Sequence, residues 1–458
     1  MSTLAYKRTN VYEKADEKLL KEIFDYAEGY KKYLDEGKTE REACASAKRM
    51  AVENGYKPFK FGQKLKAGDK VYYDNRGKNL YLIKVGKANV AEDGIRILAS
   101  HIDSPRIDFK QVPLYESEDI AFAKTHYYGG IRKYQWATIP LALHGAVALK
   151  DGSVVNVKVG EDENDPVFYI SDLLPHLAAK QNAKTLGEGI GGEDLNIWLG
   201  NIPYVAAADE KDRTVKENLL KILNEKYGMT EEDFLSAELC VVPAYKAKDI
   251  GFDRALIGAY GHDDRVCSYP AFTALFDEKS DEHTTMVVLA DKAEIGSDGT
   301  TGMQCAVFLD LIDEIAASFG VSSAAVRANS KCLSADVNAA FDPNFKGVSE
   351  PLNSAYVSCG AGITKFTGAR GKSSSNDADA EFLGFLRRIF DENGVIWQTG
   401  EMGKVDEGGG GTVAKYIAKA NIDTIDIGVP VISMHSPFEL VSKADVYEVY
   451  LAFRAFLK

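Results

Sequence analysis

The stretch TTMVVLADKAEIGS occupies residues 284–297 and joins an apolar run to a short acidic loop. A continuous apolar run such as MVVLA is typical of a strand that is buried on both faces of a sheet. A helix-like segment, MQCAVFLDLIDEIAASF, follows at 303–319, and strand-like and helix-like segments then alternate toward the C-terminus. This alternation predicts an α/β fold with a mixed sheet flanked by helices.

The segments before this stretch divide into two kinds. Residues 13–35 and 39–54 carry apolar residues at helical spacing, and strand-like runs follow at 70–74, 79–86 and 95–100. The next part, up to about residue 250, is instead rich in β-like runs, with a polar helix-like piece around 209–227. The simplest organisation is one discontinuous domain with an inserted β-rich domain, and the predicted bounds are 1–105 with 255–458 for the first and 106–254 for the second.

The composition limits the kinds of partner. The 458 residues are 45% hydrophobic and 27% charged, as in soluble globular proteins, and the formal net charge is −13. This charge argues against a nucleic-acid partner or an anionic membrane surface. No apolar run is long enough to cross a bilayer, and six scattered cysteines form no C-x-x-C pair. We therefore expect free thiols and a cytoplasmic protein.

Histidines and acidic residues stand where apolar segments end or helices begin. Each has an ordinary explanation on its own, such as a helix cap or a turn. Together, two imidazoles and three carboxylates suit a divalent metal, with zinc expected and cobalt or manganese as alternatives. If one carboxylate is shared, the set gives three ligands to each of two ions, and its members are His101, Asp263, Glu294, Asp336 and His435.

Several longer motifs resemble the aspartyl aminopeptidase family of metallopeptidases, including its vacuolar aminopeptidase branch. They follow the order of that family from near residue 100 to near residue 440, and they read SHIDSPR, YGGIRKYQW, LLPHLA, GHDDRVCSY, DKAEIGS, LSADVNAAFDPN and ISMHSPFE. The resemblance implies a zinc-peptidase-like catalytic domain and an inserted dimerisation domain. It also implies peptide substrates and a homo-oligomer, a tetrahedral dodecamer built from dimers.

The resemblance assigns a role to each ligand. One ion would be bound by His101, Asp263 and Asp336, and the other by Asp263, Glu294 and His435. Asp263 would then be the bridge between the two ions.

The resemblance also assigns roles around the ligands. Asp103 would orient His101, and the peptide bond between Asp263 and Asp264 is a candidate for the cis form. His176, in LLPHLA, corresponds to a residue that reaches the active site of a neighbouring subunit in the family.

The loop DKAEIGS departs from the family pattern, which has two consecutive glutamates. The first is the general base and the second a metal ligand, but here the pair is Ala293 and Glu294. A methyl group cannot accept a proton from metal-bound water, so we expect impaired turnover with metal binding retained. The alternatives are a natural pseudo-peptidase, or a substitute acid such as Asp264 or Glu401.

The substrate remains open between acidic and neutral N-terminal residues. Lys365 matches a family position linked to substrate binding, whereas Ala339 and Ser373 replace a His and a Tyr of the family. Two other functions stay possible, a non-catalytic protein that binds metal and peptides, and a related two-metal amidohydrolase.

Two further features of the sequence are interpreted as structural. GARGKSS at 368–374 lacks the first glycine of a phosphate loop, so we reject a nucleotide site. The remaining histidines have no carboxylate at ligand-like spacing, and we interpret His126, His144, His262 and His283 as structural residues.

Overall fold

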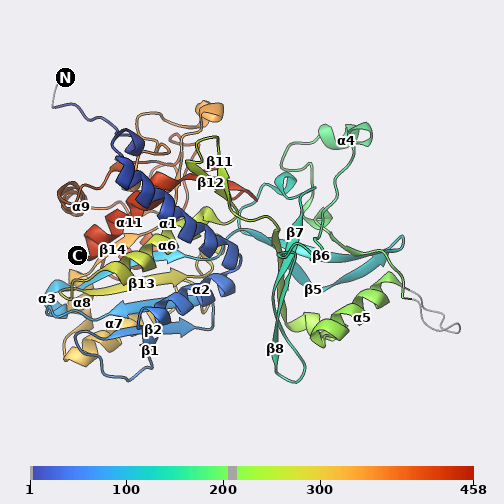
Figure 1. The fold of residues 1–458 in the computed structure, drawn as a ribbon, viewed down its shortest axis with the longest axis horizontal. Coiled ribbons are helices and arrows are strands. Elements are labelled where there is room, and N and C mark those ends of the chain that lie inside the picture. The colour runs from blue at the N-terminus through green and yellow to red at the C-terminus, as the bar shows by residue number, and fades with distance from the viewer. Residues whose placement is uncertain (1–3, 205–213) are drawn as a thin grey trace. The chain divides into compact units, whose positions relative to one another are not determined.

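The computed structural model describes residues 4–204 and 214–458. The described chain forms two compact units (Figure 1). Unit 1 contains the residues up to Ser104 together with Ala247–Met434 and Glu439–Lys458, and unit 2 contains Pro105–Lys246 and His435–Phe438. The existence of an inserted domain at 106–254 that folds independently stays a prediction.

A nine-stranded mixed sheet forms the centre of unit 1, in agreement with the predicted α/β fold. Its central strands are parallel to one another, and antiparallel pairs lie toward both edges. In sheet order the strands are β1 (Lys57–Pro58), β2 (Lys70–Asn75), β3 (Asn79–Lys84), β13 (Thr284–Ala290), β4 (Ile95–His101), β14 (Lys331–Ser334), β18 (Asp423–Gly428), β16 (Ala361–Thr364) and β17 (Trp397–Thr399).

The segment TTMVVLA is β13, and its apolar side chains alternate between two cores. Val287 and Leu289 belong to one buried cluster, whereas Met286 and Val288 belong to the other. A strand with both faces buried favours apolar residues at successive positions, which explains the unbroken run at 286–290.

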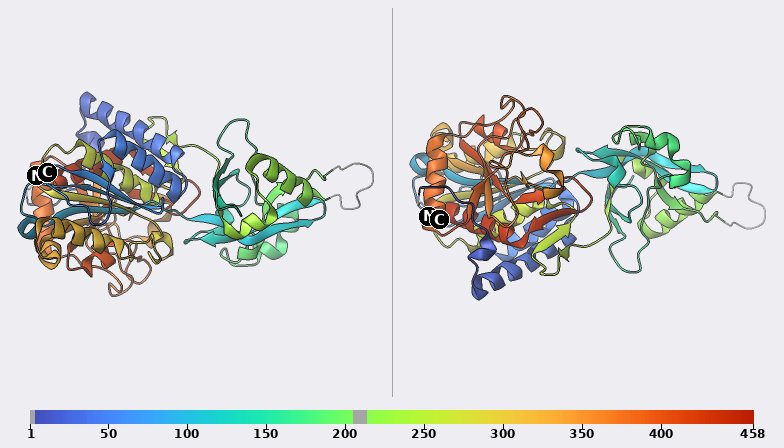
Figure 2. Two further views of the ribbon diagram at one scale, coloured as in Figure 1. Left: turned by 90° about the horizontal axis from the view of Figure 1, so that it is seen from below. Right: turned by 90° about the horizontal axis from the view of Figure 1, so that it is seen from above.

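Helices therefore cover both faces of this sheet (Figure 2). The first face packs against α1 (Glu17–Glu36), α2 (Glu40–Glu53), α6 (His262–Asp277), α9 (Ala380–Glu392) and α11 (Lys443–Leu457). The second face packs against α3 (Val90–Asp93), α7 (Val307–Phe319), α8 (Ser323–Asn329) and α10 (Ala414–Ala418). No helix in the described part of the chain has the length and apolar character that a bilayer span requires.

A second, five-stranded sheet of unit 1 supports the start of α6. Its strand order is β11 (Lys248–Ile250), β12 (Leu256–Ala259), β20 (Glu439–Ser442), β19 (Pro430–Ile432) and β15 (Asn338–Ala339). β12 leads directly into α6, and the turn between β19 and β20 carries His435. Asp263 and His435, two of the proposed metal ligands, are therefore close in sequence to strands of this sheet.

Unit 2 is built on a six-stranded antiparallel sheet. The strand order is β8 (Val154–Val159), β7 (Leu141–Ala148), β10 (Ala237–Pro243), β5 (Arg106–Ser117), β6 (Ile120–Tyr128) and β9 (Ile197–Gly200), with the helices α4 (Ala179–Asn182) and α5 (Val215–Tyr227). The predicted helix at 209–227 is α5, although its predicted first residues lie outside the described part.

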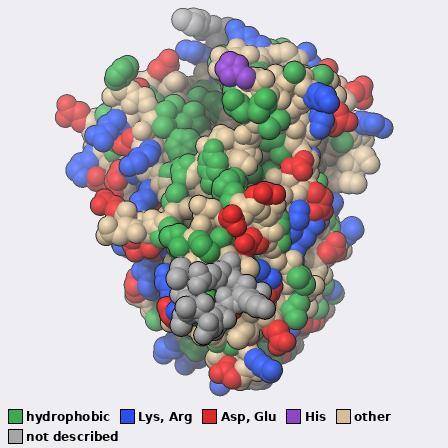
Figure 3. Space-filling view, turned by 90° about the vertical axis from the view of Figure 1, so that its right-hand side faces the viewer, with side chains coloured by type: hydrophobic (Ala, Val, Ile, Leu, Met, Phe, Trp, Pro, Cys, Tyr) green, Lys and Arg blue, Asp and Glu red, His purple; other side chains and the backbone are tan. Residues whose placement is uncertain are grey.

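One face of unit 2 gathers hydrophobic side chains around a hollow (Figure 3). We define an apolar patch of unit 2 by five exposed residues, Tyr169, Leu173, Leu174, Leu177 and Trp198. Tyr169 and Trp198 are paired by an isolated β-bridge, and Leu173, Leu174 and Leu177 follow closely in the chain. Large apolar side chains grouped in this way are typical of an interaction surface.

Candidate metal centre

The parallel register of the central sheet brings three chain segments to one edge. Ala290 of β13 pairs with His101 of β4, and Ser334 of β14 pairs with Ala99. The residues after β13 and after β14 therefore emerge on either side of His101. Because the carboxyl ends of parallel strands meet at one edge, Glu294 and Asp336 can approach the same histidine.

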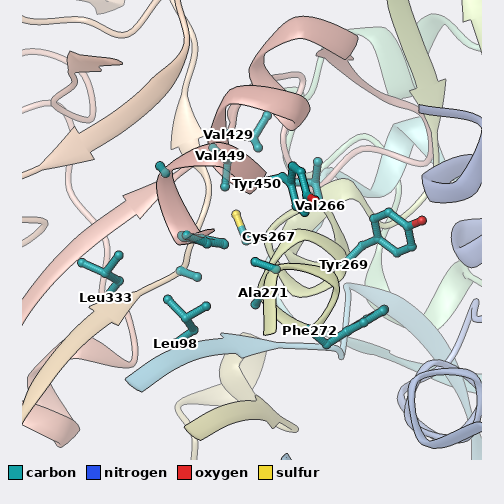
Figure 4. Packing of buried hydrophobic residues seen from close by; sticks show 14 of the residues in the cluster. Leu98, Val266, Cys267, Tyr269, Ala271, Phe272, Leu333, Val429, Val449 and Tyr450 are labelled. Carbon is teal, nitrogen blue, oxygen red and sulfur yellow. The ribbon is translucent and has the colours of Figure 1, made fainter. Parts of the chain in front are cut away.

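Helix α6 brings Asp263 to this edge. Its Val266, Cys267 and Ala271 are buried in the same cluster as Leu98 and Leu333 of the sheet (Figure 4). This packing holds the first turn of α6 against the ends of β4 and β14. The peptide bond between Asp263 and Asp264 is cis, as predicted.

Five side chains converge into two groups that share Asp263. In the first group, His101 Nε2 lies 3.2 Å from Asp263 Oδ1 and 4.0 Å from Asp336 Oδ1. The ligand atoms of His101, Asp263 and Asp336 all lie within 4.8 Å of one another, and the same holds for Asp263, Glu294 and His435. Imidazole and carboxylate donors at these separations fit a zinc-type ion in each group.

Both imidazoles are held so that Nε2 remains available as the ligand atom. His101 Nδ1 lies 3.0 Å from the Asp103 carbonyl and 3.2 Å from Asp103 Oδ1. His435 Nδ1 lies 2.8 Å from the Gly130 carbonyl. A carbonyl oxygen only accepts hydrogen bonds, so Nδ1 carries the proton in both rings. Such contacts commonly fix the tautomer of metal-binding histidines.

Asp103 also holds the loop that follows β13. Its carboxylate is fully buried, and Oδ1 and Oδ2 accept the N–H groups of Ala293 and Glu294, each at 3.1 Å. One side chain therefore joins a histidine of the first group to the backbone of the second. The role of Asp103 in orienting His101 stays a prediction. The hydrogen bonds from Ala293 and Glu294 are additional to that role.

Replacing Asp103 with Asn is expected to weaken zinc binding by about 10–100-fold. The amide would direct an NH₂ group at N–H donors, so at least one donor would lose its acceptor. Competition with a chromophoric chelator measures this affinity. Asp298→Asn is the matched control, because Asp298 is exposed in the same loop. Equal zinc affinity in the two variants would contradict the role given to Asp103.

Asp263, which both groups share, is held by residues that sequence reasoning missed. The N–H of Asp263 donates to Glu439 Oε2 at 3.1 Å, and Ser104 Oγ donates to the Asp263 carbonyl at 2.6 Å. Glu439 is buried and lies at the start of β20. The only signal in the sequence was its place in the motif ISMHSPFE.

Burial and charge control protonation at the centre. Burial alone would lower the pKa of His101, but hydrogen bonds to Asp103 and Asp263 raise it well above its usual value. Burial raises the pKa of Asp264 well above its usual value, and the charge of Asp336 adds to this effect. A histidine must be neutral to bind a metal, so protons and metal ions compete for His101.

The position predicted for a general base carries only a methyl group. Ala293 opens the short 3-10 helix Ala293–Ile295 and packs partly against the apolar cluster of the second sheet face. Asp264 is fully buried and accepts the N–H of His101 at 3.2 Å, and it belongs to neither ligand group of the described residues. Glu401 belongs to neither ligand group of the described residues, so it gains no support as a substitute.

Two predicted substrate-binding residues lie outside both groups. His176 is exposed in the 3-10 helix Pro175–Leu177 of unit 2. Lys365 is half-exposed, and its Nζ lies 2.5 Å from Asp377, which also pairs with Lys372 at 2.9 Å. The charge of Lys365 is therefore already partly neutralised within the chain.

Two of the histidines interpreted as structural contact carboxylates from other parts of the chain. His144 Nε2 lies 3.0 Å from Glu161, and His283 Nδ1 lies 2.7 Å from Asp93. Asp93 is 190 positions away from His283, so spacing along the chain could not reveal this contact. His262 fits a structural role, since Tyr30 contacts its Nδ1 at 2.7 Å and burial lowers its pKa to about 3.

Comparisons with known proteins relate this chain to zinc aminopeptidases. Residues 33–457 match the family model described as Aminopeptidase I zinc metalloprotease (M18). The chain is 49% identical over 456 residues to a probable M18 family aminopeptidase 1 of Clostridium acetobutylicum, covering 98% of this chain and 97% of that protein. A protein of the same description from Thermotoga maritima is 44% identical over 446 residues, covering 95% of this chain and 96% of that protein.

Solved structures extend the similarity to the fold. The crystal structure of an M18 family aminopeptidase from Thermotoga maritima superposes with a TM-score of 0.94 at 42% identity, covering 99% of this chain and 100% of that chain. The S. cerevisiae mApe1 dodecamer has a TM-score of 0.76 at 20% identity, covering 94% of this chain and 96% of that chain, which shows a shared fold only.

Proposed function

This chain belongs to the M18 family of zinc aminopeptidases, and from that premise we propose that it binds two zinc ions and accepts the N-termini of peptides. The observation that carries the proposal is the sharing of Asp263 between two groups of three ligands. One ion would be held by His101, Asp263 and Asp336, and the other by Asp263, Glu294 and His435. Zinc bound there would supply a Lewis acid and a water of lowered pKa.

The residues of the chain perform the positioning. Asp103 and the Gly130 carbonyl keep each imidazole in the tautomer that exposes Nε2. Glu439 holds the N–H of Asp263, so that the carboxylate of the bridging residue is fixed relative to β20. Rigidly placed ligands favour a fixed geometry at the reacting carbonyl of a substrate.

We also propose that turnover by this chain is impaired. General-base catalysis needs a group within hydrogen-bond reach of the proton that it removes. The side chain of Ala293 has no such group, whereas Glu294 keeps the ligand position. The same substitution favours a second candidate function, in which the protein binds metal and peptides without cleaving them.

We propose a preference for neutral N-terminal residues over acidic ones. Lys365, the expected cation for an acidic side chain, already pairs with Asp377. Measured with an Ala293→Glu variant and a panel of aminoacyl substrates, kcat/KM is expected to be higher for Leu, Met or Ala than for Asp or Glu. If Asp or Glu substrates are cleaved fastest and Lys365→Met removes that preference, the neutral assignment is wrong.

We further propose that the chain acts as a homo-oligomer, specifically a dodecamer built from dimers. The apolar patch of unit 2 supports this proposal, since Leu177 is 67% exposed and Leu173 and Leu174 are half-exposed beside His176. Monomeric soluble proteins rarely leave such residues grouped at the surface. The S. cerevisiae protein named above is described as a dodecamer. We also propose a cytoplasmic location, which suits the six free cysteines.

Twelve chains of 50.1 kDa would give a native mass of about 600 kDa by light scattering. Leu177→Asp is expected to lower this mass, because a charge in an apolar interface opposes association. Val154→Asp is a suitable control, since Val154 is also exposed in unit 2 but lies outside the patch. A native mass of a single chain for the unmodified protein would contradict the proposal.

A further inference from the structure

Unit 2 contains an apolar cavity beneath α5. Its volume is about 210 Å³, and it lies between this helix and residues of β5, β7, β8, β9 and β10. The helix contributes Leu219, Ile222 and Leu223, and the sheet contributes Leu143 and Val157 among others. All these residues belong to unit 2, so the cavity depends on this unit alone.

The apolar side of α5 is only partly covered by the described chain. Leu219, Ile222 and Leu223 follow the three- and four-residue spacing of one helix face. Val215 is nevertheless the single buried residue of the helix, and Ile222 is 51% exposed. A helix face of this kind normally packs against a core, so the space left here is suited to an apolar guest.

The cavity has the size and the apolar lining of known apolar binding cavities. An engineered protein cavity of about 150 Å³, lined by Leu, Ile and Phe, stays dry and binds benzene. The cavity under α5 is larger and has similar walls, which include Phe109, Phe168 and Met229. An alkyl chain of about eight carbons is therefore a suitable guest.

One charged side chain lines the cavity among the described residues, and it is Lys226 near the end of α5. Its Nζ lies 5.3 Å from the centre of the Tyr227 ring. The pKa of Asp165 is lowered mainly by hydrogen bonds from the N–H groups of Gly160 and Asp162. The positive charge of Lys226 is the smallest of the causes that lower it, so Asp165 engages Lys226 only weakly. In a chain of net charge −13, this ammonium at an apolar cavity favours an anionic head group.

We propose that this cavity binds a free medium-chain carboxylate. The alkyl chain lies between α5 and the sheet, and the carboxylate pairs with Lys226. The site is independent of the metal centre and of aminopeptidase activity, so failure of one proposal leaves the other standing.

Isothermal titration of the intact protein with octanoate tests the site. We expect one saturable site per chain with a dissociation constant of about 0.1–3 mM, as befits a ligand of ten heavy atoms. Lys226→Gln should weaken octanoate binding about 2–5-fold, the usual effect of an exposed ion pair. Lys221→Gln is the matched control on α5, because Lys221 does not line the cavity. 1-Octanol should bind Lys226→Gln and the unmodified protein equally.

Filling the cavity gives the second arm of the experiment. Leu223→Trp should reduce octanoate binding at least tenfold, with Ile222→Phe as a milder filling variant should the first fail to fold. Two results would overturn the proposal: no saturable octanoate binding by the unmodified protein, or unchanged binding in the folded filled variants. If octanoate does not bind and the filled variants also change the native mass, the occupant is a second copy of the chain.

Discussion

Replacing Ala293 with Glu is expected to raise kcat/KM for an aminoacyl substrate by about 10²–10⁴-fold, the usual contribution of a positioned general base. The variant restores a carboxylate next to Glu294, at the start of the 3-10 helix that follows β13. The assay is release of a chromophore from aminoacyl substrates by the zinc-loaded protein. Zinc content is expected to stay the same, because no ligand changes.

Ala293→Gln separates basicity from size. Glutamine has nearly the shape of glutamate but accepts no proton at neutral pH, so its kcat/KM should stay close to that of the unmodified chain. Equal activity of the unmodified chain and the Ala293→Glu variant would refute the proposed impairment. A variant that binds two zinc ions but remains inert would favour the binding function instead.

Replacing Asp263 with Asn is expected to reduce the zinc content from about two ions per chain to nearly none. The substitution leaves only two strong ligands in each group, whereas zinc sites in proteins have at least three. The neutral amide keeps the size of the side chain, so the buried position should tolerate it better than a truncation. Plasma mass spectrometry after exhaustive dialysis measures the content.

Two single-group variants provide the comparison for Asp263. Asp336→Asn and Glu294→Gln each alter one group and should each leave about one ion per chain. Retention of one ion by Asp263→Asn would show that Asp263 is not shared. Unchanged content in all three variants would place the ions elsewhere.

The sequence predicted the layered fold well because β13 is buried at every position and is apolar from Met286 onward. Such a run has few interpretations other than a strand between two helix layers, and the clusters around Met286 and Val287 agree with it. The five proposed ligands could be selected for a similar reason. Each ends an apolar segment or opens a helix, and the ends of parallel strands share one edge of a sheet.

The supporting contacts could not be predicted from the sequence. Glu439 reaches the N–H of Asp263 across 176 positions, and His283 reaches Asp93 across 190. Spacing along a chain reports only on residues within one helix or strand, whereas these contacts depend on strand order. The role of Gly130 was also hidden, because its carbonyl is common to every residue type.

The hydrogen bonds that Asp103 accepts from the loop after β13 have an evolutionary consequence. Their donors are peptide N–H groups, which every amino acid except proline provides. The identity of residue 293 is thereby uncoupled from the placement of its neighbour 294. A lineage that lost its proton acceptor at this codon would keep the rest of its architecture under selection, and a single reverse mutation would suffice to recover chemistry.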